Sequence, residues 1–264
     1  MKCKQIIDAL ERLSPKQYAC DWDNVGLLVG RREKEVKKIV VALDASREVV
    51  SFAVKEQADM LITHHPMIFS ALKKINEDHF VSEKALTLAE HGISYFAMHT
   101  NFDAVGGMAE LAAGEKYLNL SEVSPIVLSG ESDEGMGRYG KLPYPMTAKQ
   151  AAEYIKDKFN LSFVMLYQGE ETKEQIFERI AVLPGSGKSE LSEIKRQGYT
   201  LYLTGDFGHH DGLDAVDMGM TVIDATHYGL EHIFISYISG YLRDTFGNDL
   251  DIIESDSGCP LQII

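Results

Sequence analysis

The hydrophobic positions of this chain follow two periods, and the alternation between them predicts an α/β fold. The pattern indicates a strand at 39–43, an amphipathic helix at 46–57 and a second strand at 60–63. A strand–helix–strand unit of this kind requires parallel strands joined by a right-handed crossover. A helix at 82–90 and a strand at 93–98 continue the pattern. We therefore expect a largely parallel sheet with helices packed on it.

The same pattern returns in the second half of the chain. A strand at 180–183, a helix at 190–197 and a strand at 201–204 follow one another at the same spacing. When Thr204 is aligned with Thr63, the strand, helix and strand of this unit match those of the first one without a gap. The repeat predicts two pseudo-symmetric α/β halves that arose by internal duplication.

The regular pattern is interrupted between residues 121 and 146, where glycine, serine, proline and acidic residues become frequent. This segment is the best candidate for a domain boundary. We expect a first α/β half over residues 1–125 and a second over residues 126–264. A glycine-rich piece at 135–142 is expected to form a turn or a hairpin.

Histidines follow two predicted strands of the first half. His64 and His65 come directly after a buried strand, and Pro66 prevents a strand or helix from continuing there. Because side chains alternate along a strand, both imidazoles reach one site only if the backbone turns or if two metals lie beside them. His99 and Asp103 follow the next strand. Active sites and ligand sites of α/β proteins lie at the carboxyl ends of parallel strands, so these residues are site candidates.

The second half closes on a related element. When His227 is aligned with His99, Glu231 falls on Asp103. A His-x-x-x-acid element therefore closes each half. Two halves related by an approximate twofold axis would bring these strand ends together at their interface. The residues expected there as metal ligands are His64, His65, Asp103, His227 and Glu231.

This mixture of imidazoles and carboxylates suits first-row divalent metals such as zinc, manganese, iron, cobalt or nickel. Five ligands exceed the three that usually hold one catalytic zinc, and they match two divalent ions about 3.5 to 4 Å apart. Such a pair lowers the pKa of a bridging water and polarises the bond under attack, which predicts hydrolysis. The competing interpretation is that the five residues are capping and core groups.

Three further histidines have more than one interpretation. As the counterpart of His227, His99 is either a further ligand or a residue that supports the ligands or carries a proton; we favour the latter as its catalytic role. His209 and His210 follow Asp206 in a polar segment, where they either contact substrate or lie in a solvated loop.

A glycine turn between a predicted strand and helix is the candidate substrate-binding element. The Walker A spacing would need glycine where Val182 stands, so the turn is not a nucleotide triphosphatase motif. Its backbone amides either hold a substrate phosphate or carboxylate, or form a plain turn. The residues concerned are Gly185, Ser186, Gly187 and Lys188.

Charge and cysteine content narrow the class of protein. The formal net charge of −14 disfavours a non-specific nucleic-acid binder and favours a small-molecule partner. The three cysteines, Cys3, Cys20 and Cys259, are far apart and indicate reduced thiols in the cytoplasm. No apolar run reaches the ~18 residues of a membrane helix, so we expect no membrane partner.

Several ordered motifs together identify a family resemblance. They are Trp22-Asp23-Asn24-Val25-Gly26, Thr63-His64-His65-Pro66, His99-Thr100-Asn101-Phe102-Asp103, Thr204-Gly205-Asp206, and His227-Tyr228 with Glu231. This set resembles the Nif-three-like family, whose members are often labelled GTP cyclohydrolase 1 type 2 homologues. The resemblance implies two similar α/β halves, a dinuclear metal centre between them with the five ligands named above, and a ring-shaped homohexamer. Thr226 and Asp206 stand where the family usually has glycine and glutamate.

These observations predict a dinuclear metal-dependent hydrolase that acts on a nucleotide-like or phosphorylated small molecule. The family label suggests a GTP cyclohydrolase-like opening of the imidazole ring of GTP. The alternative is a noncatalytic metal-binding or regulatory ring protein that serves metal storage, metal insertion or partner binding. Turnover at a water-accessible metal pair distinguishes the two.

Overall fold

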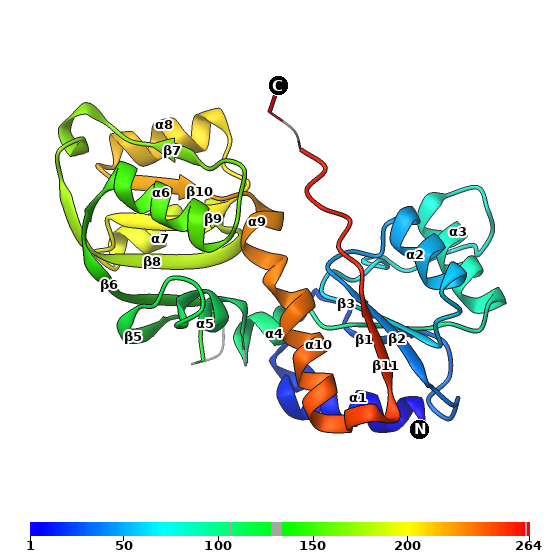
Figure 1. The fold of residues 1–264 in the computed structure, drawn as a ribbon. Helices are drawn as coiled ribbons and strands as arrows, with labels where there is room; N and C mark the ends of the chain where they lie inside the picture. The colour runs from blue at the N-terminus through cyan, green and yellow to red at the C-terminus, as the bar shows by residue number, and fades with distance from the viewer. Residues whose placement is uncertain (106, 128–133, 262) are drawn as a thin grey trace. The chain divides into compact units, whose positions relative to one another are not determined.

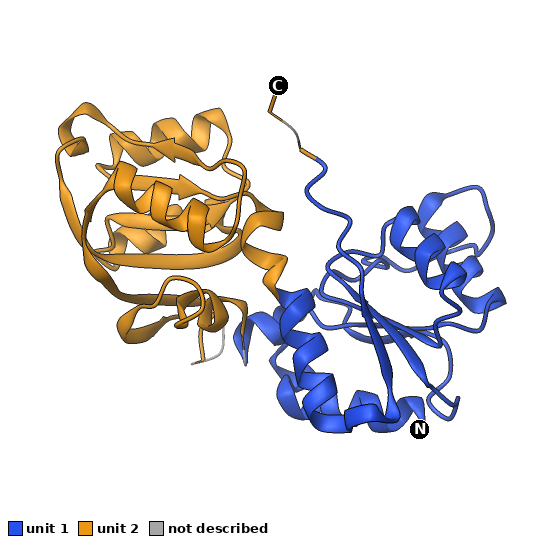
Figure 2. Ribbon diagram, in the orientation of Figure 1, with its two compact units in different colours: residues 1–105, 234–260 blue, residues 106–233, 261–264 orange. Residues whose placement is uncertain are grey.

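The computed structural model describes residues 1–105, 107–127, 134–261 and 263–264. The chain divides into two compact units (Figure 2). Unit 1 comprises residues 1–105 and 234–260, and unit 2 comprises residues 106–233 and 261–264. Each unit contains its own β-sheet, which agrees with the predicted α/β class. Among the described residues, no helix has both the length and the apolar character needed to cross a membrane.

Unit 1 is built on a five-stranded sheet with the order β1-β4-β3-β2-β11 (Figure 1). Strands β2, β3, β4 and β11 are parallel, and β1 is antiparallel to β4. The strands are β1 (Gly26–Val29), β2 (Lys38–Ala42), β3 (Met60–Thr63), β4 (Ser94–Ala97) and β11 (Asp251–Glu254). The helices are α1 (Cys3–Leu13), η1 (Lys16–Tyr18), α2 (Arg47–Lys55), α3 (Phe80–Glu90), α4 (Thr100–Ala104), α10 (Ile233–Phe246) and η4 (Gly247–Asp249).

Unit 2 is built on a six-stranded sheet with the order β5-β6-β8-β9-β10-β7. Strands β8, β9 and β10 are parallel, and β5, β6 and β7 join them in antiparallel pairs. The strands are β5 (Ser121–Ile126), β6 (Gly137–Thr147), β7 (Met165–Tyr167), β8 (Ile176–Ser186), β9 (Leu201–Gly205) and β10 (Thr221–Asp224). The helices are α5 (Met108–Ala113), α6 (Ala148–Lys158), η2 (Glu170–Thr172), η3 (Gly187–Glu190), α7 (Leu191–Arg196), α8 (His209–Asp217) and α9 (His227–Glu231).

The two sheets contain the same order of four strands. The order β7-β10-β9-β8 in unit 2 matches β1-β4-β3-β2 in unit 1, with the outer strand antiparallel in each case. Val40 pairs with Leu61 in unit 1, and Ala181 pairs with Tyr202 in unit 2. When Thr204 is aligned with Thr63, Ala181 aligns with Val40 and Tyr202 aligns with Leu61. The parallel pairs therefore share the register that the sequence repeat predicts.

The loops after the last parallel strands differ in length. Strand β4 ends at Ala97, two residues before His99, whereas β10 ends at Asp224, three residues before His227. The alignment of His227 with His99 therefore holds for the histidines and not for the strands that precede them. The loop before His227 contains one residue more, and Thr226 lies in it.

One face of the unit 1 sheet packs against α2 and α3. Val40, Leu61 and Tyr95 of the strands join Val49 and Leu88 of the helices in one buried cluster. Burying an aliphatic side chain of this size contributes roughly 1.5 to 3 kcal/mol. This apolar cluster anchors the strand ends that carry the histidines.

The observed units differ from the predicted halves in two segments. Residues 106–125 belong to unit 2, where the Arg138 guanidinium donates to the Glu110 carboxylate of α5 over 2.6 Å. Residues 234–260 belong to unit 1, because β11 pairs with β2 and the Tyr241 hydroxyl donates to the Ala9 carbonyl over 2.8 Å. These contacts join segments far apart in the sequence.

The segment predicted as a domain boundary contains strands. β5 and β6 pair antiparallel on either side of residues 128–133, which lie outside the described residues. The glycine-rich piece at 135–142 belongs to this pair, in agreement with the hairpin alternative. The turn-forming composition therefore marked a hairpin inside unit 2.

Candidate metal centre

The backbone turns directly after β3, so the two adjacent histidines of unit 1 come close together. The imidazole centroids of His64 and His65 are 4.8 Å apart and their planes are tilted by 55°. The buried Tyr95 hydroxyl stabilises this turn, since it donates to the His65 carbonyl over 2.9 Å and accepts from the Met67 N–H over 2.8 Å. Burial raises the pKa of Tyr95, so the hydroxyl keeps its proton. A turned backbone was one of the two conditions for a shared site.

His64 is completely buried, and its tautomer follows from its hydrogen bond. Nδ1 donates to the carbonyl oxygen of Met98 over 2.9 Å, because a carbonyl can only accept. Nε2 therefore carries the lone pair, and it lies 3.6 Å from Oδ1 of Asp103 on α4. The Phe234 ring packs against the imidazole with a centroid distance of 5.2 Å. The predicted His64–Asp103 pair is thus brought together within unit 1.

His65 and His99 each donate Nδ1–H to a carboxylate. His65 bonds Oδ1 of Asp44, which follows the end of β2, over 2.8 Å. His99 bonds both oxygens of Asp23 over 3.1 and 3.0 Å. In each ring the Nε2 atom is the one that can bind a metal or carry a proton.

Asp23 is held as a carboxylate at the base of His99. It also accepts hydrogen bonds from the Thr100 N–H over 3.0 Å and from the Thr100 hydroxyl over 2.6 Å. Burial alone would raise the pKa of Asp23, but the His99 imidazole and the two Thr100 donors outweigh it and lower the pKa to about 2. Asp23 also accepts from the Asn24 N–H over 2.8 Å, so it holds the local turn as well.

Three histidines of unit 1 form one potential metal-binding group. One ligand atom each from His64, His65 and His99 lies within 4.8 Å of the others. His99 was predicted as a supporting or proton-carrying residue, and its position beside the other two histidines is compatible with ligation as well. The group sits at the carboxyl ends of neighbouring strands β3 and β4.

Unit 2 contributes an imidazole–carboxylate pair on α9. Nε2 of His227 lies 3.0 Å from Oε2 of the buried Glu231. Nδ1 of His227 lies 2.8 Å from Oδ2 of Asp206, to which it donates its proton. Asp206, which stands where the resemblance predicts glutamate, reaches the imidazole with its shorter side chain.

The loop before α9 has an unusual backbone. Thr226 has φ 65° and ψ 155°, and its hydroxyl accepts from the Gly229 N–H over 3.0 Å as the helix cap. The Thr226 N–H donates to the buried Asp224 over 2.7 Å. Burial raises the pKa of Asp224 and the nearby Asp206 charge adds to this effect, while backbone N–H donors oppose it.

The four residues of the predicted substrate-binding turn have different surroundings. Gly185, with φ 78°, lies so close to α9 that a Cβ there would be 2.9 Å from Oε1 of Glu231. Gly187 is buried, and its N–H donates to the Thr204 hydroxyl over 3.0 Å. Ser186 and Lys188 are exposed. The first glycine thus borders the metal candidate, and the second helps to close the β8–η3 turn.

Two carboxylates that support histidines of unit 1 were not among the predicted site residues, Asp44 at His65 and Asp23 at His99. Asp44 lies two residues after the end of β2, and His64 lies one residue after the end of β3, so its place beyond a strand end was the available signal. His209 and His210 are the first residues of α8, and both are exposed. Among the described residues of unit 2 they join no potential metal-binding group.

These donors fit divalent metal ions. Imidazole Nε2 atoms oriented by Nδ1–H bonds to carbonyl or carboxylate oxygens are typical of metal ligands in proteins. Unit 1 supplies three such imidazoles and the Asp103 carboxylate, and unit 2 supplies one imidazole and the Glu231 carboxylate. Nitrogen and oxygen donors without a thiolate suit zinc, manganese, iron, cobalt or nickel.

Comparison with known proteins identifies the family of this chain. Residues 1–260 match the family model described as Duf34/NIF3 (NGG1p interacting factor 3). A GTP cyclohydrolase 1 type 2 homolog from Clostridium perfringens is 30% identical, covering 97% of this chain and 96% of that protein. One from Methanocaldococcus jannaschii is 33% identical, covering 97% of this chain and 100% of that protein.

Solved structures share the fold over almost the whole chain. The Staphylococcus aureus hypothetical protein SA1388 superposes with a TM-score of 0.87 at 27% identity, covering 100% of this chain and 99% of that chain. Reduced HcgD from Methanocaldococcus jannaschii superposes with a TM-score of 0.82 at 31% identity, covering 96% of this chain and 97% of that chain. Together with the family match over residues 1–260, these likenesses show that the chain belongs to the Duf34/NIF3 family.

Proposed function

We propose that this chain is a metal-dependent hydrolase of a nucleotide-like or phosphorylated small molecule. Its ligands would be His64, His65, Asp103, His227 and Glu231, which would bind two divalent ions per chain as a dinuclear centre. The names of the relatives, GTP cyclohydrolase 1 type 2 homologs, make a GTP cyclohydrolase-like reaction the first to test.

The observation that carries the proposal is the orientation of four imidazoles. His64, His65, His99 and His227 each donate Nδ1–H to a carbonyl or carboxylate oxygen over 2.8 to 3.1 Å. His91 and His232 also bond a carbonyl oxygen through Nδ1, but the four rings in addition lie beside a carboxylate or beside one another. This combination favours a shared role for Nε2 as a ligand or proton-transfer atom.

Metal ions bound by these residues would lower the pKa of water and polarise the bond under attack. The chain's own contribution is orientation and proton transfer. Asp23 engages Nδ1 of His99, which belongs to the histidine group, and the carboxylate stabilises the protonated ring. We therefore propose that His99 carries a proton at Nε2 between the nucleophile and the leaving group.

The other elements of the predicted function belong to the same proposal. The equal strand order and register of the two units support an internal duplication. The ring-shaped homohexamer and the cytoplasmic location follow from the family resemblance and the reduced cysteines. A role of Ser186 and Lys188 in substrate binding would have to come from side chains that are exposed in this chain.

Metal content per chain, measured by mass spectrometry on protein purified without chelator, tests the proposal. We expect about two divalent ions per chain. His64→Ala and Glu231→Ala should each lose at least one ion, because each substitution removes a buried ligand. The matched control is His91→Ala, since His91 also bonds a carbonyl oxygen through Nδ1 over 2.9 Å but is exposed and outside the histidine group.

Activity decides between the hydrolase and the noncatalytic alternative. The loaded protein is assayed with GTP, other nucleotides and phosphate esters, beside His99→Ala. A hydrolase whose proton carrier is His99 should lose activity about 100-fold or more in this variant while keeping its metal. Full metal content without turnover on any substrate would favour the noncatalytic metal-binding protein. Equal metal content in the wild type, His64→Ala and Glu231→Ala would remove the proposed ligands.

A further inference from the structure

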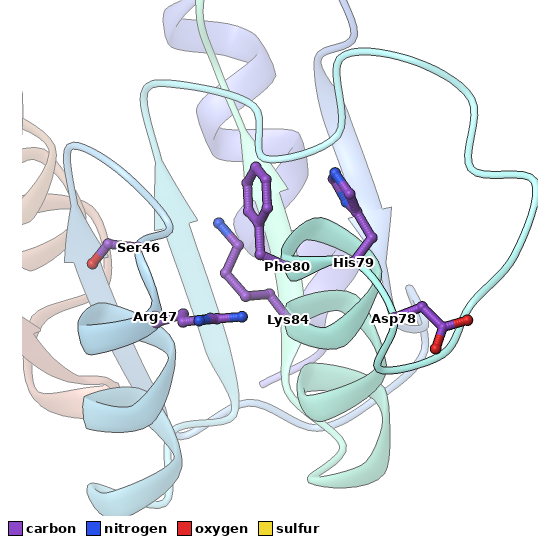
Figure 3. Close-up of a pocket in the computed structure, with 6 residues that line it drawn as sticks. All are labelled: Ser46, Arg47, Asp78, His79, Phe80 and Lys84. Atoms are coloured by element: carbon purple, nitrogen blue, oxygen red, sulfur yellow. The ribbon is translucent and has the colours of Figure 1, made fainter.

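A second feature of unit 1 is an open pocket of about 590 Å³ between the first turns of α2 and α3 (Figure 3). Its lining residues are Ser46, Arg47, Asp78, His79, Phe80 and Lys84. A volume of this size lies within the range of small-molecule sites. The residues belong to neither the histidine group nor its supporting carboxylates.

The pocket lies at the amino-terminal ends of two helices. Ser46 caps α2 and accepts from the Val49 N–H over 3.1 Å, while His79 caps α3 and accepts from the Val81 N–H over 3.3 Å. The sequence predicted that α3 would begin at residue 82, but the His79 cap starts it at Phe80. Two helices of nine and eleven residues therefore direct their positive ends toward one pocket.

Two cationic side chains line the pocket, and Arg47 is paired with Glu83, so Lys84 is the one that adds to this potential. In Figure 3, Arg47 extends from α2 toward α3, and Lys84 rises from α3 beside the Phe80 ring. The Lys84 ammonium lies 5.7 Å from the Phe80 centroid and donates to the Ala45 carbonyl over 2.5 Å. Burial lowers the pKa of Lys84, as expected for an ammonium drawn out of water, although the Asp44 charge opposes the shift.

The acidic residues nearby are accounted for by other contacts. Glu83 accepts from the Arg47 guanidinium over 2.5 Å, which fixes the arginine at the pocket wall. Asp78 accepts from the Asn76 amide over 2.6 Å, and its carboxylate points away from Lys84 in Figure 3. Lys84 thus faces the pocket as a cation with a neutral carbonyl as its hydrogen-bond partner.

We propose that this pocket binds the phosphoryl group of a nucleotide-like ligand, with Lys84 and the two helix ends as anion contacts. Phe80, whose surface is 53% exposed, provides a flat ring on which a heterocyclic base can stack. His79 extends this surface, because its ring lies 4.4 Å from that of Phe80 at 31°.

The pocket lies at the same edge of the sheet as the histidine group. α2 follows the carboxyl end of β2, and α3 follows the loop after β3, which carries His64 and His65. Asp44, which supports His65 over 2.8 Å, is only two residues from Ser46 in the pocket wall. Assigning the bound anion as the substrate's phosphoryl group rests on the proposed hydrolase function; the pocket itself is tested independently.

The test is isothermal titration of the full chain with inorganic phosphate and with adenosine 5′-monophosphate. Lys84→Met should weaken both probes by about tenfold, because it removes one charge-assisted contact without removing side-chain volume. Phe80→Leu should weaken adenosine 5′-monophosphate and leave phosphate unchanged. The matched control is Lys116→Met, since Lys116 lies 5.2 Å from the Tyr117 ring in the same kind of cation–ring contact.

Metal content separates this proposal from the proposed function. Lys84→Met should retain the metal of the wild type, and phosphate should still bind to His64→Ala. Equal phosphate affinity in Lys84→Met and the wild type would overturn the proposal that this pocket binds the anion. Loss of phosphate binding in His64→Ala would overturn it too, because the phosphate would then be bound by the metal. A wild type without metal that still binds phosphate through Lys84 would overturn the hydrolase alone.

Discussion

Thr226 adopts a backbone conformation that is easy for glycine and strained for a β-branched residue. Its φ of 65° and ψ of 155° fall in a region that is nearly restricted to glycine, at a cost of roughly 1 to 3 kcal/mol. The same residue caps α9 through its hydroxyl, which stabilises a helix by about 1 kcal/mol. Strain and capping therefore act in opposite directions at one position beside His227.

Substitutions at Thr226 separate these two effects. We expect Thr226→Gly to be at least as stable as the parent chain, because relief of strain offsets the lost cap and the greater freedom of the unfolded chain. Thr226→Ala keeps the strained backbone and loses the cap, so it should be about 1 kcal/mol less stable. Urea denaturation measures both, with Thr226→Ser as the variant that preserves the cap. A stable alanine variant would contradict the capping role.

The contribution of Asp59 to stability is expected to depend on pH. Burial would raise the pKa of Asp59, but the N–H groups of Lys37 and Lys38 and the Lys34 ammonium outweigh it and lower the pKa below its ordinary value. The folded-state pKa therefore lies below the unfolded one, so the carboxylate stabilises fully above about pH 5 and progressively less as the pH falls through the folded value. Asp59→Asn should be about 1 kcal/mol less stable at pH 7.

The pH series provides the control for Asp59. The difference in unfolding free energy between Asp59→Asn and the parent chain should shrink below about pH 4. Denaturant titrations at several pH values measure this difference. A gap that stays constant over the acid range would show that the substitution acts through packing rather than through the charge.

At the scale of elements, the β8–η3 turn requires glycine at position 187, because there is no room for a side chain. A Cβ on Gly187 would overlap the Tyr202 hydroxyl and would lie 2.5 Å from the Thr204 hydroxyl. Gly187→Ala should therefore lower the free energy of unfolding by about 2 to 3 kcal/mol. Gly240→Ala is the matched control, since nothing lies within 4 Å of its added Cβ inside α10 and alanine favours a helix by about 0.5 to 1 kcal/mol. Thermal unfolding of both variants checks the contrast.

The regular elements were predictable because their signals are local. The strand and helix patterns at 39–63 correspond to β2, α2 and β3, and Ser46 caps the helix as a short polar residue should. The start of α3 was wrong by two residues, because a histidine cap leaves no strong sequence signal. Asp44 was missed because one aspartate after a strand is common, and only folding shows that it reaches His65.

At the scale of the whole molecule, the limits of the units were the least predictable feature. Residues 234–260 return to unit 1 through β11 and α10, which are ordinary amphipathic segments. Their partners, β2 and the carbonyl of Ala9, lie near the start of the chain, and no local pattern records such contacts. The composition change near residue 130 was a stronger local signal, and it marked a hairpin.

The return of the chain's last segments to unit 1 has a consequence for biosynthesis. Domains usually fold in order from the amino terminus while the ribosome still extends the chain. Here the described core of unit 2 lies within one continuous stretch that leaves the ribosome before α10 and β11. The edge of β2 in residues 1–105 therefore stays unpaired until β11, Asp251–Glu254, has been synthesised. The sheet whose first strands are synthesised first is therefore completed only after the sheet of unit 2.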